Sequence, residues 1–207
     1  MICRMATEIE LKARVSDSEA LRRLLNEKAE YLGAFVKDDT YWQLPGGQRL
    51  RVRRDRRNKP DGSEECAIYV TRKKKALKDG IEINYEREFE VKFPPEKRPG
   101  EGLGEGPSTD QFTEILAEIG LKPGLSKQKR GWAYNYLGIT AELVEVSGNG
   151  LNLGWFMELE IIVPDGAACR EKATTKERER LMDFLSELGI GAEAIEGRYY
   201  NELLGCQ

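Results

Sequence analysis

The stretch TEIELKARV, residues 7–15, alternates charged and apolar side chains along most of its length. Glu8, Glu10 and Lys12 occupy every second position, and the residues between them are apolar. Because successive side chains of a strand point to opposite faces, the three charges share one face and the apolar side chains share the other. One such strand is typical of a sheet with a face in water, so the fold depends on whether other strands repeat the pattern.

Most of the other predicted strands do repeat it. Alternation and turn residues predict strands at 40–44, 48–55, 66–75, 83–93, 127–138, 139–148 and 154–163. In these strands, charged residues at every second position share one face. Strand by strand, the charged residues of these faces are Arg49, Arg51 and Arg53; Lys73; Glu88 and Glu90; Lys127 and Lys129; and Glu158 and Glu160. These faces carry almost only Arg, Lys and Glu, and the opposite faces are apolar. This favours a closed barrel with its charged side inward over an open sheet with that side in water.

The predicted helices do not alternate regularly with the strands. They cover residues 16–33, 109–121, 174–190 and 197–204. Without a repeated strand–helix–strand order, an antiparallel sheet or barrel is favoured over a doubly wound fold. We therefore expect a mainly β (α+β) protein with one domain over residues 1–207. Its core would be a closed antiparallel eight-stranded β-barrel forming a tunnel, with helices packed outside and a flexible connection at about 94–110.

The overall composition narrows the chemistry. The chain has 33 Lys and Arg against 36 Asp and Glu, a net charge of −3, so no global charge favours nucleic acid or an anionic membrane as a partner. It has no histidine, which removes the usual general base and the usual zinc ligand. Its four cysteines form no Cys-x-x-Cys pair and indicate reduced thiols in a cytoplasmic protein. No apolar run reaches membrane-spanning length, and Met5 is an alternative start to Met1.

A charged barrel interior needs a ligand that balances it. Clustered carboxylates in a desolvated interior repel one another, and divalent metal ions bound to their oxygens relieve this repulsion. Clustered Arg and Lys side chains match an anion that is rich in acceptor oxygens, and phosphate chains supply these best. Hard carboxylate oxygens without soft ligands favour Mg²⁺ or Mn²⁺. The pattern therefore predicts a site for a metal-bound polyphosphate.

Segments along nearly the whole chain resemble, in the same order, the CYTH superfamily, also called triphosphate tunnel metalloenzymes. EIELK at 8–12 resembles the Glu-x-Glu-x-Lys signature of that family. The end of the chain, GRYYNELL at 197–204, resembles the closing segment of its CyaB-like branch. The segments between them that resemble the family's later strands are LRVRR (50–54), AIYVTRK (67–73), EREFEV (86–91), KQKRGW (127–132), ITAELVEV (139–146) and LGWFMELEI (153–161).

The resemblance implies roles for individual residues. The catalytic residues that it implies are Glu8, Glu10 and Lys12. The metal ligands that it implies are Glu8, Glu10, Glu142, Glu158 and Glu160. The phosphate-binding residues that it implies are Lys12, Arg51, Arg53, Lys73, Lys127, Lys129 and Arg130, with the choice between the successive cations Lys129 and Arg130 for the interior left open. The supporting residues are Arg49, Glu88 and Glu90.

Three functions agree with these residues. The first is metal-dependent hydrolysis of inorganic tripolyphosphate, thiamine triphosphate or a nucleoside triphosphate. The second is a CyaB-like adenylyl cyclase that makes cyclic AMP and pyrophosphate from ATP, and the third is a non-catalytic polyphosphate-binding module. We favour hydrolysis because water is always available, whereas cyclisation needs an adenine pocket that the sequence does not identify. The expected partner is a triphosphate-containing small molecule, with no membrane or nucleic acid, and a homodimer is possible.

Overall fold

The computed structural model describes residues 4–44, 48–78, 81–91, 110–163 and 170–205. Its helical elements are α1 (Ser18–Lys28), α2 (Asp110–Glu118), α3 (Arg170–Glu187), the short 3₁₀ helix η1 (Ala192–Ala194) and α4 (Tyr200–Leu203). Its strands are β1 (Arg4–Val15), β2 (Glu30–Gln43), β3 (Arg49–Asn58), β4 (Glu64–Lys78), β5 (Ile81–Val91), β6 (Lys122–Tyr136), β7 (Ile139–Gly148) and β8 (Leu151–Val163).

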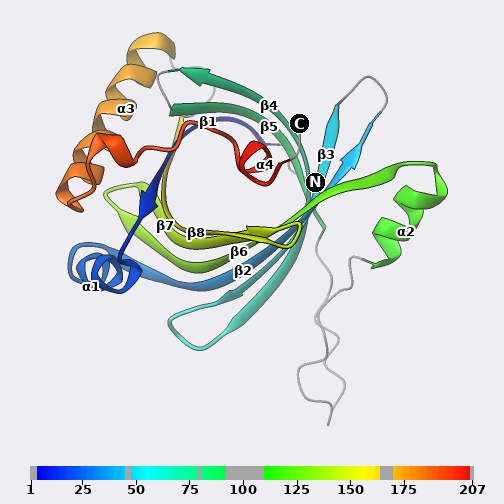
Figure 1. Ribbon diagram of the computed structural model, residues 1–207, viewed down its shortest axis with the longest axis horizontal. Coiled ribbons are helices and arrows are strands. Elements are labelled where there is room, and N and C mark those ends of the chain that lie inside the picture. The colour runs from blue at the N-terminus through cyan, green and yellow to red at the C-terminus, as the bar shows by residue number, and fades with distance from the viewer. Residues whose placement is uncertain (1–3, 45–47, 79–80, 92–109, 164–169, 206–207) are drawn as a thin grey trace.

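The strands pair in the order β1-β5-β4-β3-β2-β6-β7-β8, and every pair is antiparallel. Strand β1 pairs with β5 on one side and with β8 on the other, so the order returns to its first strand (Figure 1). This is the strand order of a closed barrel. The predicted antiparallel arrangement of eight strands is therefore confirmed.

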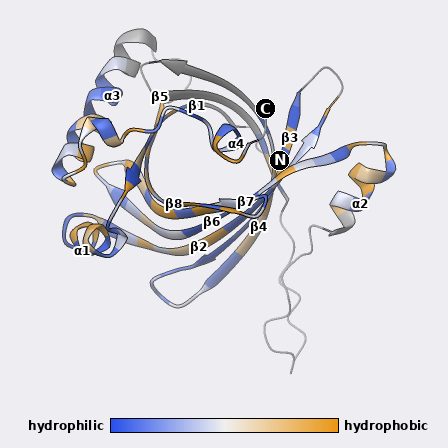
Figure 2. Cartoon of the chain, in the orientation of Figure 1, coloured by the Kyte–Doolittle hydropathy of each residue, from blue (hydrophilic) through white to orange (hydrophobic). Residues whose placement is uncertain are grey.

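The outer face of the barrel wall is apolar where two helices cover it. Ile9, Leu11 and Leu159 are fully buried there, in one cluster with Leu25 of α1 and Leu181 of α3. Figure 1 shows α1 and α3 outside the ring of strands, and Figure 2 shows hydrophobic and hydrophilic residues mixed along the strands. Fully burying one large apolar side chain contributes about 1.5–3 kcal/mol, so this outer face supplies much of the folding energy.

A second apolar cluster lies beneath α2. Trp42, Val52 and Ile68, from three adjacent strands, pack with Leu116 of α2 and are all nearly inaccessible to solvent. This cluster accounts for the short amphipathic helix that the sequence predicts after the Pro- and Gly-rich connection. The helix covers apolar side chains that the strands alone would leave in water.

The last helix lies in a different place from the one predicted. Figure 1 shows α4 inside the ring of strands, whereas all helices were expected to pack outside it. Tyr200 of α4 is buried in a small cluster with Phe35 and Phe156, and its ring meets that of Phe156 edge to face, with centroids 5.1 Å apart. The helix is inside because the barrel interior offers these apolar side chains next to its charged ones.

The first helix is also shorter than predicted. Helix α1 ends at Lys28, and residues from Glu30 onward form β2, so the predicted helix over 16–33 is wrong in its last turn. Gly33, which resembles a helix stop in the sequence, has a φ of 127° within β2. A Cβ atom there would lie 2.3 Å from the carbonyl oxygen of Asn58, so glycine permits the close approach of β2 to the end of β3.

Several sequence predictions fall outside the described residues. These include Met1 and, apart from Asp110, the flexible connection predicted at 94–110. Cys66 is a free thiol, and the other three cysteines lie outside the described residues. None of the helices in the described part of the chain is long and apolar enough to cross a membrane.

Candidate functional site

Charged side chains predicted from the strand periodicity meet inside the barrel. Glu10 of β1 lies opposite Glu160 of β8, Lys12 lies opposite Glu158, and Glu158 lies opposite Glu142 of β7. Residues directly opposite each other in an antiparallel pair have Cβ atoms about 4.5–5.5 Å apart. Three adjacent strands therefore bring these charges onto one continuous inner surface.

Asp39 of β2 binds cations from two neighbouring strands. Arg53 donates to its two carboxylate oxygens at 2.6 and 3.0 Å, and Lys127 Nζ lies 3.3 Å from Oδ2. Burial would raise the pKa of Asp39, but Arg53 and Lys127 outweigh burial and hold this pKa well below its usual range. Burial also acts against the charge of Arg53, but Asp39 outweighs it and raises the pKa of Arg53 well above its usual value. Both partners therefore stay charged.

Lys129 of β6 binds Glu158 of β8 in the same interior. Its Nζ lies 2.7 and 2.6 Å from the two carboxylate oxygens, and both side chains are buried. The hydroxyl of Tyr200 donates to Glu158 Oε1 at 2.6 Å. Burial would lower the pKa of Lys129, but Glu158, followed by Glu10, outweighs burial and raises it. Glu158 thus holds both a lysine and the C-terminal helix.

A third ion pair joins Lys37 of β2 to Glu142 of β7. Lys37 Nζ lies 2.7 Å from Glu142 Oε2, and only 7% and 12% of the two side chains are exposed. Burial lowers the pKa of Lys37, and Glu142 offsets this only in part. Burial would raise the pKa of Glu142, but Lys37 and Lys129 outweigh it and lower this pKa. The pair is therefore held together against a substantial cost of desolvation.

The remaining basic residues lie along β3. Arg51 donates to Thr71 Oγ1 at 3.0 Å and to Glu88 Oε2 at 3.3 Å, and the Thr71 hydroxyl donates to the same carboxylate at 2.7 Å. Arg49 lines a hollow of about 250 Å³ together with Tyr41 at the end of β2. Glu88 therefore contacts Arg51 both directly and through Thr71, and Arg49 lies toward one end of the barrel.

The structure places the two successive cations of β6 on opposite faces. Lys129 is buried inside, whereas Arg130 is exposed and donates to Glu145 on the outer face at 2.6 Å. Lys129 is therefore the interior residue, and Arg130 lies away from the predicted site. Lys73 lies in β4 opposite Glu86, but its side chain is outside the described residues. The side chain of Glu8 is partly buried, and that of Glu90 is exposed.

Sequence reasoning missed interior residues on β2 and α4. On β2, Phe35, Lys37, Asp39 and Tyr41 follow the same two-residue period as the strands that were found. This signal was hidden because the preceding residues were assigned to a helix and the strand was expected only from Thr40. Tyr200 has no periodic signal, since a short helix entering a barrel cannot be recognised from its own sequence.

The acidic residues suit a hard cation by their chemistry. Glu8, Glu10 and Glu160 offer only carboxylate oxygens, the donors that Mg²⁺ and Mn²⁺ prefer. Within the described ranges, no group of three Asp, Glu, Cys or His side chains is already arranged to hold a metal ion. Glu142 and Glu158 each bind a lysine instead. Glu10 and Glu160 are like charges at opposed positions, so a cation between them would relieve their repulsion.

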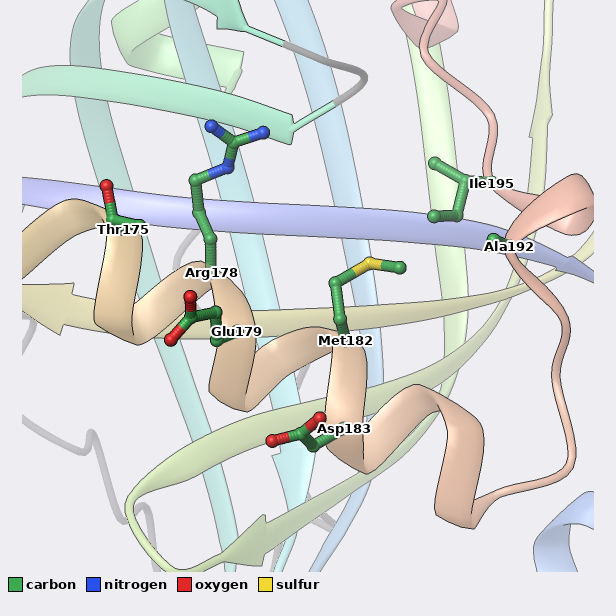
Figure 3. Close-up of a pocket in the computed structure, with 7 residues that line it drawn as sticks. All are labelled: Thr175, Arg178, Glu179, Met182, Asp183, Ala192 and Ile195. Carbon is green, nitrogen blue, oxygen red and sulfur yellow. The ribbon is translucent and has the colours of Figure 1, made fainter.

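A separate hollow of about 610 Å³ lies outside the barrel, between α3 and the segment around η1 (Figure 3). Its charged lining residues are one cation, Arg178, and two acids, Glu179 and Asp183, and apolar side chains such as Met182 complete it. Two carboxylates beside one guanidinium do not suit a phosphate chain. The barrel interior therefore remains the candidate site.

Solved structures similar to this chain cover nearly all of it. The PH1819 protein from Pyrococcus horikoshii OT3 is 27% identical, with a TM-score of 0.70 and coverage of 95% of this chain and 97% of that chain. The PH1012 protein from the same organism is 27% identical, with a TM-score of 0.66 and coverage of 95% and 98%. HpAC1 from Hippeastrum, a putative adenylyl cyclase with a dominant triphosphatase activity, is 16% identical, with a TM-score of 0.56 and coverage of 98% and 97%, and shares the fold. No curated protein matches this chain.

The family model of the CYTH domain matches residues 6–200. This range begins in β1, two residues before Glu8, and ends at Tyr200, so it includes the whole charged interior described above. The chain therefore belongs to the CYTH domain family.

Proposed function

We propose that this protein hydrolyses a triphosphate inside its barrel with the help of a divalent metal ion. One observation carries the proposal: basic and acidic side chains from five neighbouring strands share one buried interior, where they are paired with each other. Buried ion pairs are costly to desolvate and contribute little to stability, so their number here is better explained by a ligand than by folding. Members of the CYTH family act on triphosphates, which agrees with this interior.

The phosphate chain would be bound by the basic residues of the interior. The guanidinium and ammonium donors would come from Arg51, Arg53, Lys127, Lys129 and Lys12. Lys73 is proposed to join them. Carboxylates of the interior hold several of these cations in place. Phosphate oxygens accept the same hydrogen bonds, so an entering triphosphate exchanges one set of anionic acceptors for another. The protein's own carboxylates thus help to position the proposed binding groups.

The metal ion would be held on the acidic side of the interior. Glu8, Glu10 and Glu160 are proposed as ligands because they offer hard carboxylate oxygens, and Glu10 lies opposite Glu160. Two further proposed ligands, Glu142 and Glu158, bind Lys37 and Lys129 in this structure. These last two carboxylates could join only after phosphate has taken over their lysines. A bound Mg²⁺ or Mn²⁺ ion would supply charge neutralisation and an activated water.

The chain's own residues would then position the reaction. The cations of β3 and β6 fix the phosphate chain, and Lys12 of β1 lies beside the acids, where it would stabilise charge that develops on the transferred phosphoryl group. Glu8, Glu10 and Lys12 are therefore proposed as the catalytic residues. Hydrolysis needs no further binding group, because the attacking water requires only a held terminal phosphorus.

Adenylyl cyclase activity is the second candidate, and one observation favours it. The hollow of about 250 Å³ beside Arg49 and Tyr41 is also lined by Trp42 and Asn149. It offers aromatic rings and an amide, groups that suit a nucleobase, near the end of the basic strand β3. The adenine pocket that the sequence left unidentified would lie here.

The deciding experiment incubates the purified protein with Mg²⁺ or Mn²⁺ and either tripolyphosphate or ATP, and then separates orthophosphate, pyrophosphate and cyclic AMP. We expect orthophosphate from tripolyphosphate, no activity in EDTA, and at least about a hundredfold loss of rate in Glu10→Gln. Glu145→Gln, the same change on the outer face, should retain the wild-type rate. Cyclic AMP and pyrophosphate from ATP with intact tripolyphosphate would establish the cyclase instead, and binding without turnover would establish a polyphosphate-binding module.

A further inference from the structure

The phenol ring of Tyr200 lies among three lysines from two strands of the barrel. The Nζ atoms of Lys12, Lys127 and Lys129 lie 5.5, 5.2 and 5.0 Å from the centroid of this ring. All three lysines are buried, with at most 7% of each residue exposed. A single aromatic ring therefore lies within cation–π distance of three buried ammonium groups.

The hydroxyl of the same residue binds a carboxylate that one of these lysines, Lys129, also binds. Tyr200 Oη donates to Glu158 Oε1 at 2.6 Å, and Lys129 Nζ contacts both oxygens of Glu158. Lys12 lies opposite Glu158 in the register of β1 and β8. Tyr200 thus contacts the anionic and the cationic parts of the site at once.

The ring offsets the electrostatic repulsion among the three lysines. Three ammonium groups near one point repel one another, and burial removes the water that would screen them. The negative face of an aromatic ring attracts cations without carrying a net charge. The ring therefore attracts the three lysines without neutralising their charge, as a further carboxylate would.

The position of Tyr200 is fixed by contacts other than those with the lysines. Its ring packs edge to face on Phe156, and the chain before it pairs with β1 through Ile195 and Ala13. Glu196, next in the chain, accepts hydrogen bonds from Arg14 at 3.2 and 3.0 Å. The barrel wall and the rim thus set the place of the ring, and the ring in turn sets the place of the lysines.

We infer that Tyr200 is a positioning residue that gathers Lys12, Lys127, Lys129 and Glu158 into a single binding centre for a phosphate chain. This inference rests on the proposed function for its ligand, and it assigns a role to the C-terminal helix. In the opposite role, Tyr200 would occupy the place of the phosphate, and its removal would change the affinity for the anion in the opposite direction. Removal of the ring would then strengthen the binding of the anion.

Two substitutions separate the ring from the hydroxyl. Tyr200→Phe keeps the ring and loses the hydrogen bond to Glu158, whereas Tyr200→Leu loses both but retains an apolar side chain. Tyr134→Phe is the matched control, because Tyr134 is a buried tyrosine of the outer apolar cluster whose hydroxyl donates to Asn26. Lysine labelled with ¹³C at Cε reports directly on the ring by NMR, with signals assigned by Lys→Arg variants.

We expect the Cε–H signals of Lys12, Lys127 and Lys129 to be shifted upfield by the ring in the wild type. These shifts should persist in Tyr200→Phe and disappear in Tyr200→Leu. In calorimetry with tripolyphosphate and EDTA, where no turnover occurs, Tyr200→Phe should bind about tenfold more weakly, since one hydrogen bond to a charged group is lost. Tyr200→Leu should lose about a further tenfold with the cation–π contacts, and Tyr134→Phe should behave like the wild type.

Unshifted lysine signals in the wild type would overturn the inference, as would equal or tighter binding of tripolyphosphate by Tyr200→Leu. A wild-type protein that neither binds nor hydrolyses tripolyphosphate would contradict the proposed function instead. In that case the lysine signals still decide whether Tyr200 gathers the three ammonium groups. The two ideas therefore fail in distinguishable ways.

Discussion

The two faces of the barrel wall carry opposite kinds of side chain only one residue apart. On β8, Leu159 is fully buried in the outer apolar cluster, whereas its neighbours Glu158 and Glu160 belong to the charged inner face. The outer face buries apolar surface, which favours folding directly. The inner face buries charges, whose mutual attraction must first repay the loss of hydration. The wall therefore separates the apolar burial that favours folding from the charged face of the proposed site.

Variants that remove charges from the inner face should test this separation most strongly. Lys37→Met leaves the buried Glu142 without its closest cation, so we expect a loss of about 3–5 kcal/mol in the free energy of unfolding. The double variant Lys37→Met/Glu142→Leu removes both charges, and its stability should equal or exceed that of the wild type. Urea denaturation of the three proteins measures these differences, and hydrolysis by the double variant should be lost.

The exposed pair Arg56–Asp38, whose side chains are 46% and 38% exposed, is the matched control on the outer face. Arg56→Met should cost less than about 1 kcal/mol because water replaces the lost partner. A double variant of the inner pair as unstable as Lys37→Met alone would contradict the comparison. It would mean that the ion pairs of the inner face hold the fold together.

A substitution on the outer face should lower the stability of the protein and leave its rate of hydrolysis unchanged. Leu159→Ala creates a cavity between the wall and the helices, so we expect a loss of about 2–5 kcal/mol in the free energy of unfolding. The molecules that remain folded should hydrolyse substrate at the wild-type rate, because the inner charges are untouched. Urea denaturation measures the free energy of unfolding. The rate of hydrolysis is measured at urea concentrations well below the unfolding midpoint and is normalised to the amount of folded protein.

Leu151→Ala is the control, since Leu151 is in the same strand but 50% exposed, and it should change stability by less than about 0.5 kcal/mol. A folded Leu159→Ala protein with a greatly reduced rate would show that the two faces are coupled through the backbone of β8. The separation of folding from binding would then be incomplete.

The sequence alone predicts the fold where the two faces alternate cleanly. Glu10 and Glu160 each lie between apolar neighbours, so the inner and outer sides of their strands are evident from the two-residue period. Strand β2 lacks this clarity, because Asp38 and Asp39 are both acidic although Asp38 points outward and Asp39 inward. Gly33 also favoured a helix that continues to residue 33, whereas the chain from Glu30 onward pairs as a strand.

Two features of the site depend on contacts that no local pattern encodes. Lys129 and Arg130 are successive cations, and only the pairing of β6 with β2 and β7 decides which of them faces inward. The entry of Tyr200 into the barrel depends on Phe35 and Phe156, which are far from it in sequence. Residue type and spacing predicted candidate residues for the inner face, and the long-range packing determined which of them lie there.

Glu196 lies where the chain passes from the outer wall into the barrel, so it tests the boundary between the two faces. Its carboxylate accepts hydrogen bonds from the side chain and backbone nitrogen of Arg198 and from Arg14. These bonds, above all those from the Arg198 side chain, outweigh burial and lower the pKa of Glu196 to about 2. Both arginines are largely exposed, so solvent screens much of this interaction.

Glu196→Gln should therefore cost only about 1 kcal/mol in the free energy of unfolding at pH 7. Because the pKa of Glu196 is lower in the folded protein, the wild-type advantage is complete above its ordinary pKa of 4.5 and is lost as the pH falls from there toward 2. Urea denaturation of both proteins at pH 7, 4.5, 3 and 2 measures the difference, with the exposed Glu193→Gln as control. An advantage that stays constant down to pH 2 would show that Glu196 acts by packing, like a residue of the outer face, and that its charge contributes nothing.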